Sequence, residues 1–334
     1  MSTEGSAAEH SGTAMATVFS ERRSDLVVTA RETPAAGVVA LTLADPSGAQ
    51  LPAWTPGAHI DVLLADDLVR QYSLCGSPAD QHSWRIAVLL DERGRGGSRR
   101  VHETLQVGST VAVRGPRSHF PLHAAERYIF IAGGIGITPI LPMIGAATES
   151  GADWELWYGG RSRASMAFLD HLAQYGDRVN VWPDDESGLL PLDRILGQPS
   201  EGTLVYVCGP EPLLSATEQR CAPWPAGALN LERFAAKPQE AAAGEPTGFD
   251  VVCQRSGVTV SVAAGRSIVD ALEDNGISVL SSCLEGVCGT CETRVLEGIP
   301  EHRDSLLTED ERESNEYMMI CVSRSLSERL VLDL

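Results

Sequence analysis

Near its C-terminal end the chain reads Cys283-Leu284-Glu285-Gly286-Val287-Cys288-Gly289-Thr290-Cys291, and a fourth cysteine follows at Cys321. A C-x4-C-x2-C run with a distant fourth cysteine is the plant-type spacing of a 2Fe–2S cluster. Gly286 and Gly289 allow backbone N–H groups to turn toward the cluster sulfurs, where hydrogen bonds tune the reduction potential. Because such a cluster carries one electron at a time, the sequence predicts a component of an electron-transfer system.

Two other uses of these cysteines fit the pattern less well. A structural zinc site normally repeats a C-x2-C pair, whereas this chain has one such pair and two outlying cysteines. Disulfides are rare in chains without a signal peptide, and two of the thiols lie three residues apart. The other cysteines are scattered, and we expect them to stay reduced: Cys75, Cys208, Cys221 and Cys253.

Composition argues against nucleic-acid and membrane partners. With 26 basic and 45 acidic residues the net charge is −19, whereas nucleic-acid binding calls for a basic face. No run approaches the roughly 18 apolar residues that span a membrane, so we expect a cytoplasmic protein. Residues 1–22, rich in Ser, Ala, Gly and Thr, are predicted to be a disordered leader. From Thr247 onward the chain has 16 acidic residues and 7 arginines. This negative charge suits either docking on a basic partner or simple solubility.

The chain divides into successive segments that differ in their pattern of apolar residues. Residues 23–124 contain short apolar runs between turn clusters, which predicts an all-β barrel. Residues 125–236 alternate apolar strands with helical segments, as in a doubly wound α/β domain. Residues 237–246 have the composition of a linker. Residues 247–334 are predicted to form an α+β module with a helix over 267–275 and a last strand around Cys321.

The barrel segment carries Arg70-Gln71-Tyr72-Ser73. Arg70 can bind a phosphate through two hydrogen bonds, Tyr72 can pack against an aromatic ring, and Ser73 can hydrogen-bond a ring nitrogen. The glycine-rich run Gly94-Arg95-Gly96-Gly97-Ser98 offers a nest of backbone N–H groups for the same phosphate. The alternatives are an Arg–Tyr pair on a strand and a hairpin tip, each without a ligand.

Two glycine-containing turns mark the α/β segment. Gly133-Gly134-Ile135-Gly136-Ile137-Thr138-Pro139 follows a predicted strand and opens a helix, a setting in which glycines let a dinucleotide pyrophosphate approach the helix N-terminus. The run is not G-x-G-x-x-G, so an ordinary Rossmann dehydrogenase fits badly. Cys208-Gly209-Pro210 ends another strand at the same carboxyl edge, where open α/β sheets bind ligands. The alternative is a turn without a ligand.

In this order the motifs resemble those of the phthalate dioxygenase reductase family. Its members are relatives of ferredoxin–NADP reductase with a plant-type ferredoxin of the β-grasp fold at the C-terminus, and they include vanillate demethylase reductases. The resemblance covers Asp25 to Leu334. It implies a barrel that binds FMN rather than FAD, an α/β domain that binds NADH, with NADPH left open, and a monomer.

The resemblance also implies roles for single residues. Arg70 and Gly96-Gly97-Ser98 would contact the FMN phosphate, while Gln71, Tyr72, Ser73 and the backbone of Ala87, Val88 and Leu89 would line the isoalloxazine. Thr138 would close the nicotinamide entrance, and Phe234 would cover the flavin face. The nicotinamide nucleotide would lie along Gly133, Gly134, Gly136, Arg161, Arg163, Cys208, Gly209 and Pro210.

The implied activity is that of an oxygenase reductase. NADH would deliver a hydride to FMN, and single electrons would leave through the cluster to a terminal oxygenase, of the Rieske type or alternatively a cytochrome P450. No side chain is expected to act as a general acid or base. Two other classes are a redox-sensing switch, which would lack hydride transfer, and a supplier of free reduced flavin, which would not need the cluster.

Overall fold

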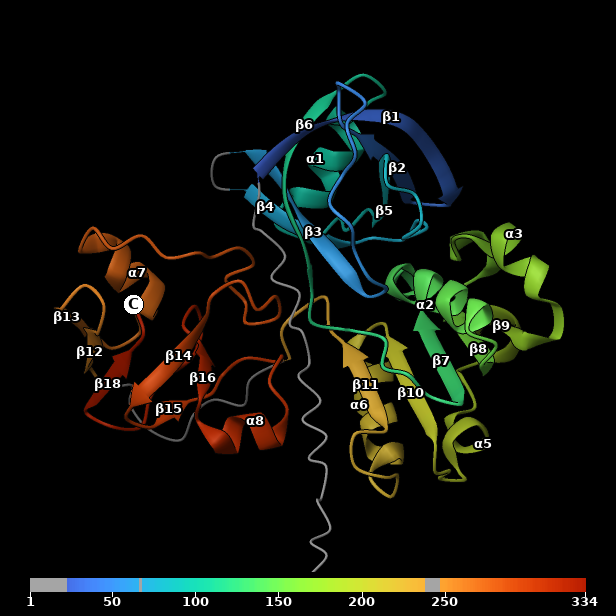
Figure 1. Cartoon of the computed structure of the whole chain (residues 1–334). Coiled ribbons are helices and arrows are strands. Elements are labelled where there is room, and N and C mark those ends of the chain that lie inside the picture. Colours follow the sequence, from blue (N-terminus) through green and yellow to red (C-terminus); the bar gives the residue numbers. More distant parts are fainter. Residues whose placement is uncertain (1–22, 66–67, 238–246) are drawn as a thin grey trace, which may run out of the picture.

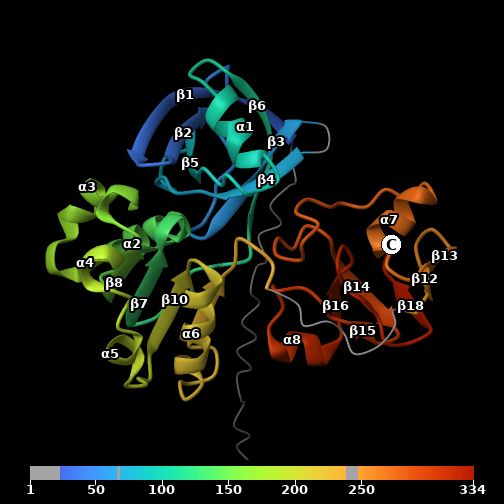
Figure 2. The same ribbon diagram turned by 180° about the vertical axis from the view of Figure 1, so that it is seen from behind.

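The chain folds around three main sheets, each in its own lobe (Figures 1 and 2). The computed structural model describes residues 23–65, 68–237 and 247–334. The predicted leader, residues 1–22, and all of the predicted linker except Lys237 lie outside the described residues. The predicted fold class, a barrel followed by an α/β domain and a ferredoxin-like module, is confirmed.

The first lobe is an antiparallel sheet with strand order β4-β3-β6-β1-β2-β5. A bridge between Leu74 and Ile86 joins the ends of the sheet and closes the barrel. Apolar side chains such as Leu41, Ile60 and Trp84 fill its interior. The elements are β1 (Arg23–Ala35), β2 (Val38–Ala44), β3 (Ala58–Ala65), β4 (Leu68–Ser73), β5 (Ser83–Leu89), α1 (Gly97–Thr104) and β6 (Thr110–Ser118).

The second lobe is a five-stranded parallel sheet with order β11-β10-β7-β8-β9. Helices α2 and α3 cover one face and α5 and α6 the other, which is the predicted doubly wound arrangement. The strands are β7 (Arg127–Gly133), β8 (Asp153–Gly160), β9 (Val179–Pro183), β10 (Thr203–Cys208) and β11 (Leu229–Glu232). The helices are η1 (Gly134–Gly136), α2 (Ile137–Glu149), η2 (Arg163–Ser165), α3 (Leu169–Leu172), η3 (Ala173–Arg178), α4 (Asp184–Ser187), α5 (Leu192–Leu196) and α6 (Glu211–Cys221). No helix in the described ranges is long and apolar enough to cross a membrane.

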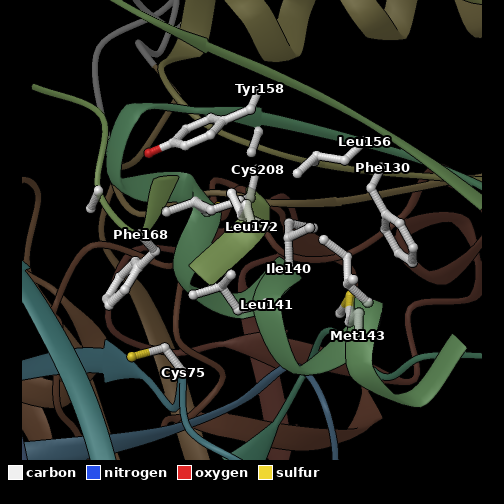
Figure 3. Packing of buried hydrophobic residues seen from close by; sticks show 14 of the residues in the cluster. Cys75, Phe130, Ile140, Leu141, Met143, Leu156, Tyr158, Phe168, Leu172 and Cys208 are labelled. Atoms are coloured by element: carbon white, nitrogen blue, oxygen red, sulfur yellow. The ribbon is translucent and has the colours of Figure 1, made fainter. Parts of the chain in front are cut away.

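The barrel and the parallel sheet share one apolar core. Cys75 and Ala87 of the barrel belong to the same buried cluster as Leu141 and Phe168 of the second lobe (Figure 3). Arg85 lies over the Phe168 ring, 5.1 Å from its centroid. Burial of this much apolar surface fixes the two lobes relative to each other.

The third lobe is a mixed sheet of order β13-β12-β18-β14-β16 with a separate β15–β17 pair. Its elements are β12 (Phe249–Cys253), β13 (Val258–Val262), α7 (Ile268–Asp274), β14 (Glu292–Glu297), β15 (Pro300–Glu301), α8 (Glu309–Ser314), β16 (Tyr317–Met319), β17 (Arg324–Ser325) and β18 (Arg329–Leu332). The predicted strand around Cys321 is wrong. Cys321 lies in the turn after β16, where the Met319 carbonyl accepts hydrogen bonds from the N–H groups of Val322 and Ser323.

Two tyrosines hold the segment that crosses from the barrel to the parallel sheet. The Tyr206 hydroxyl accepts a hydrogen bond from the His123 N–H (2.8 Å) and donates one to the Pro121 carbonyl (3.0 Å). The Tyr128 hydroxyl donates to the His123 carbonyl (2.8 Å) and accepts from the Ala125 N–H (2.9 Å). Each hydroxyl therefore satisfies backbone groups of this segment.

Tyr206→Phe tests this anchor. The change leaves the His123 N–H and the Pro121 carbonyl without partners, so we expect a loss of about 1–3 kcal/mol in the unfolding transition of this lobe. Tyr317→Phe is the control, because Tyr317 is exposed and its hydroxyl bonds to no residue that the structure describes. Denaturant titration followed by tryptophan fluorescence measures both, and equal stability of the two variants would contradict the anchoring role.

Candidate functional site

Strand β4 and the start of α1 form the predicted phosphate site. The Arg70 guanidinium donates to the Val69 carbonyl (2.7 Å) and to the Arg95 carbonyl (3.2 Å). A Cβ atom at Gly97 would lie 2.4 Å from the Arg70 side chain, so glycine is required for this approach. No side chain caps the N-terminus of α1, and its free N–H groups together with Arg70 suit a phosphate.

Other predicted flavin residues line the same side of the barrel. Tyr72 is half-buried against the barrel core, and burial raises the pKa of its hydroxyl. The Ser98 hydroxyl accepts a hydrogen bond from the Asp91 N–H (3.0 Å) and so closes the 91–98 loop. Ala87, Val88 and Leu89 lie in β5, and the Val88 carbonyl is hydrogen-bonded to His102 Nε2 (2.9 Å). Flavin contacts by these residues stay predictions.

A buried carboxyl group meets Ser73 where the two lobes join. The Ser73 hydroxyl donates to Glu232 Oε2 (3.4 Å), and the Cys208 thiol lies 4.0 Å from the same oxygen. Burial raises the pKa of Glu232 to about 8, while the hydrogen bond from Ser73 lowers it. Burial, followed by the charge of Glu232, also raises the pKa of the Cys208 thiol. This environment favours the protonated form of Glu232.

The two glycine turns lie against each other at the carboxyl edge of the parallel sheet. A Cβ at Gly133 would lie 2.6 Å from Pro210 Cδ, and one at Gly136 would lie 2.2 Å from the Cys208 carbonyl oxygen. A Cβ at Gly209 would lie 3.0 Å from Gly133 Cα. The structure thus brings the two predicted nucleotide motifs together by backbone-to-backbone contact. A Cβ at Gly134, by contrast, would meet nothing within 4 Å.

The remaining nucleotide-side residues occupy different environments. The buried Thr138 hydroxyl donates to the Ile135 carbonyl (3.0 Å) and closes the turn before α2. Arg163 forms a two-oxygen ion pair with Glu186 (3.0 and 3.1 Å), whereas Arg161 is exposed at the end of β8. The Asp185 N–H donates to the Arg161 carbonyl (3.2 Å), so the acidic helix α4 lies beside both arginines.

The four predicted cluster cysteines converge from the loop and the distant turn. Cys283 contacts the thiols of Cys288 and Cys321, and Cys321 contacts that of Cys291. In the described part of the chain, no three His, Cys, Asp or Glu side chains are arranged to hold a single metal ion. The pairs Cys283–Cys288 and Cys291–Cys321 instead suit two irons with two thiolates each.

Backbone groups of the cluster loop turn toward the thiols, as predicted from its glycines. The Glu285 N–H donates to Cys283 Sγ (3.3 Å), and the Gly286 N–H bonds Cys321. Gly286 and Gly289 both have φ of 69°, which glycine adopts without strain. These donors would stabilise the negative charge of cluster sulfurs.

All three lobes meet at one small cavity of about 90 Å³. Ser73 and Gln71 line it from the barrel, Glu232 and Phe234 from the end of the second lobe, and Val287 from the cluster loop. Phe234 is 45% exposed, so its ring is only partly covered at this junction. Three residues predicted to contact the flavin, Gln71, Ser73 and Phe234, therefore border one space together with Val287 of the cluster loop.

The sequence analysis missed three groups at this junction: Glu232, Asp61 and His59. Glu232 directly follows an apolar strand and precedes Phe234, a position that could have attracted attention. Asp61 and His59 alternate with apolar residues along β3 and carry no motif. That no side chain acts as an acid or base stays a prediction, and Glu232 is the side chain most relevant to it, because its pKa is raised.

Comparison with known proteins identifies the modules. Residues 251–326 match the model of the 2Fe-2S iron-sulfur cluster binding domain, and residues 130–219 match that of the oxidoreductase NAD-binding domain. The predicted cluster module and nucleotide domain are confirmed.

Relatives cover almost the whole chain. "Phenoxybenzoate dioxygenase subunit beta" of Ectopseudomonas oleovorans is 43% identical over 89% of this chain and 93% of its own length. The structure of phthalate dioxygenase reductase is 34% identical with a TM-score of 0.69, covering 93% of this chain and 98% of the other. The structure of an intact type IV self-sufficient cytochrome P450 monooxygenase is 46% identical with a TM-score of 0.88. The match covers 93% of this chain but only 41% of that longer chain. The chain therefore belongs to the phthalate dioxygenase reductase family, oxygenase reductases that pass electrons from NAD(P)H through a flavin and a 2Fe–2S cluster.

Proposed function

We propose that this reductase binds FMN, oxidises NADH, and delivers single electrons to an oxygenase component with a Rieske centre. The observation that carries the proposal is the junction cavity, which Ser73, Glu232, Phe234 and Val287 line together. This cavity brings residues predicted to contact the flavin next to the cluster loop, which supports transfer of electrons from a flavin bound there to the cluster. FMN, when bound, accepts a hydride and releases its two electrons singly.

The residues divide the work of binding and positioning. Arg70 and the first turn of α1 would hold the phosphate of FMN, and Tyr72 would pack on its ring. Gly133, Gly136 and Gly209 keep two backbone turns close enough to cradle a pyrophosphate. Glu232 and Ser73 would hold a proton beside the ring nitrogen, while Phe234 would give way to nicotinamide.

The charge pattern beside β8 favours NADH over NADPH. Glu186 neutralises Arg163, and α4 places Asp184 and Asp185 next to it. A 2′-phosphate bound here would meet like charges. The exposed Arg161 is the charge that would favour NADPH, so the ratio of kcat/KM for the two nucleotides is the deciding measurement.

The acceptor is inferred from potential and from the relatives. A plant-type cluster lies near about −400 mV, and Rieske centres lie between about −150 and +300 mV, so transfer is downhill. A relative matched over nearly its whole length is a subunit of a dioxygenase. The similarity to a self-sufficient P450 favours a haem monooxygenase as the second candidate. Reconstitution with one oxygenase of each type, scored by product formed per NADH consumed, distinguishes them.

Cys288→Ser distinguishes reduction of the flavin by NADH from transfer of electrons through the cluster. Loss of this thiolate removes the cluster, so cytochrome c reduction should fall to the background rate while ferricyanide reduction by the flavin is largely kept. Cys221→Ser is the control, because this buried thiol lies in α6, away from the junction. Loss of neither activity would favour a flavin reductase, and absence of NADH oxidation in the parent protein would favour a redox sensor.

Arg70→Ala tests the phosphate site and the identity of the flavin. Removing a guanidinium that bonds a phosphate should cost about 1.5–3 kcal/mol, or roughly 10–100-fold in the Kd for FMN. Arg100→Ala removes an equal charge from the exposed side of α1 and should leave the Kd unchanged. Fluorescence titration of apoprotein gives both values, and chromatography of released flavin must show FMN. Release of FAD would refute the assignment.

Glu232→Gln tests the protonated carboxyl. The pKa of Glu232 is raised from 4.5 to about 8 on folding, so the folded state binds more protons and stability is lost as pH rises through this window. We expect the thermal midpoint of the parent, relative to the Gln variant, to fall between pH 5 and about 8 and then to level off. Calorimetry at constant ionic strength measures it, and parallel curves would show that the carboxyl titrates normally.

A further inference from the structure

The cluster loop is fastened to the barrel through one buried carboxylate. Asp61 on β3 is completely buried. Its Oδ1 accepts hydrogen bonds from Gln71 Nε2 (3.0 Å) and from the Ser282 hydroxyl (3.0 Å). Arg117 lies 2.6 Å from the same oxygen, and Arg114 lies 3.1 Å from Oδ2. A buried charge is costly unless it is paired and hydrogen-bonded. Here Oδ1 accepts three hydrogen bonds, from Gln71, Arg117 and Ser282, and Oδ2 is paired with the Arg114 guanidinium.

This network joins the predicted flavin strand to the cluster ligands. Gln71 immediately precedes Tyr72 on β4, and Ser282 immediately precedes the ligand Cys283. Arg114 extends the same network, because its guanidinium also donates to the Ser281 carbonyl (3.2 Å). Asp61 thus accepts hydrogen bonds from both sides of the path that electrons must take.

Two flanking contacts hold the rest of the loop. Arg95 donates to the Cys283 carbonyl (3.4 Å) and pairs with Glu285 (2.9 Å), but both side chains are partly exposed, so the pair adds little. A Cβ at Gly289 would lie 2.4 Å from the His119 ring, which itself stacks on His59 at 5.9 Å. The loop therefore contacts the barrel in two ways: Gly289 packs closely against the His119 ring, and Ser282 hydrogen-bonds the Asp61 carboxylate.

We propose that Asp61 is a positioning residue for transfer of single electrons from flavin to cluster. Held by Ser282 on one side and Gln71 on the other, it fixes the cluster loop against the barrel at one separation. Electron transfer slows steeply as carriers move apart, so a loose loop would slow the cluster's reduction without affecting hydride transfer. This inference rests on the proposed function for its kinetic part.

The network joins two lobes that have separate apolar cores. Asp61 lies in the barrel and Ser282 in the third lobe, 221 positions away in the sequence. Loss of the Ser282 hydrogen bond removes one contact between the lobes and leaves both cores unchanged, so we expect the loop to loosen while each lobe stays folded. A role in global stability predicts the opposite, a lower unfolding midpoint with no local change.

Ser282→Ala and Asp61→Asn test the proposal, with Ser281→Ala as the matched control. Hydrogen exchange measures the protection of the backbone amides of residues 281–289, in the protein without cofactors and in the protein with its cofactors bound. Removing one hydrogen bond to a charged group should lower their protection about tenfold in Ser282→Ala. Ser281 contributes its backbone carbonyl, so Ser281→Ala should keep parental protection.

Rapid-mixing with NADH separates flavin reduction from cluster reduction. The first phase should match the parent in every variant, and the second should slow in Ser282→Ala and Asp61→Asn. Parental protection together with a parental second phase in Ser282→Ala would overturn the proposal, even if Asp61→Asn fails to fold because Arg114 and Arg117 lose their partner. Absence of the first phase in the parent would refute the proposed function instead, and the exchange result would stand on its own.

Discussion

Apolar packing between the barrel and the parallel sheet is the constraint on which the site depends. Cys75 and Ala87 share a core with Leu141 and Phe168, and such an interface behaves like the interior of a single domain. Because this core sets the lobes at a fixed distance, Glu232 at the end of β11 reaches Ser73 on β4. A sliding interface could not hold a 3.4 Å contact between residues 159 apart in sequence.

The third lobe contacts the barrel mainly through polar groups. Its contacts with the barrel include the hydrogen bond from Ser282 to the buried Asp61, the exposed Arg95–Glu285 ion pair and the close approach of Gly289 to the His119 ring. Polar contacts of this kind specify a position, because a misplaced loop removes the Ser282 hydrogen bond to Asp61 and the Ser281 carbonyl from Arg114.

Sequence reasoning succeeded where spacing alone carries the chemistry. The cysteine spacing identified the cluster loop, and the glycine turns identified the sheet edge, since both are local consequences of short segments. It failed where long-range contacts decide. A strand was expected around Cys321, but hydrogen bonds from the Val322 and Ser323 N–H groups to the Met319 carbonyl close a turn there. Asp61 and Glu232 gain their roles from partners 221 and 159 residues away, which no local pattern contains.

The cluster loop contacts the barrel on one side and is partly exposed elsewhere. Gly289 faces the His119 ring and Ser282 faces Asp61, so this side is closed by the barrel. Cys283 is the least buried of the four thiols, and the neighbouring Leu284 is 50% exposed. The barrel therefore closes one side of the loop, while Leu284 leaves another part open to solvent. Tight attachment at Asp61 is thus compatible with contact between the exposed part of the loop and another protein.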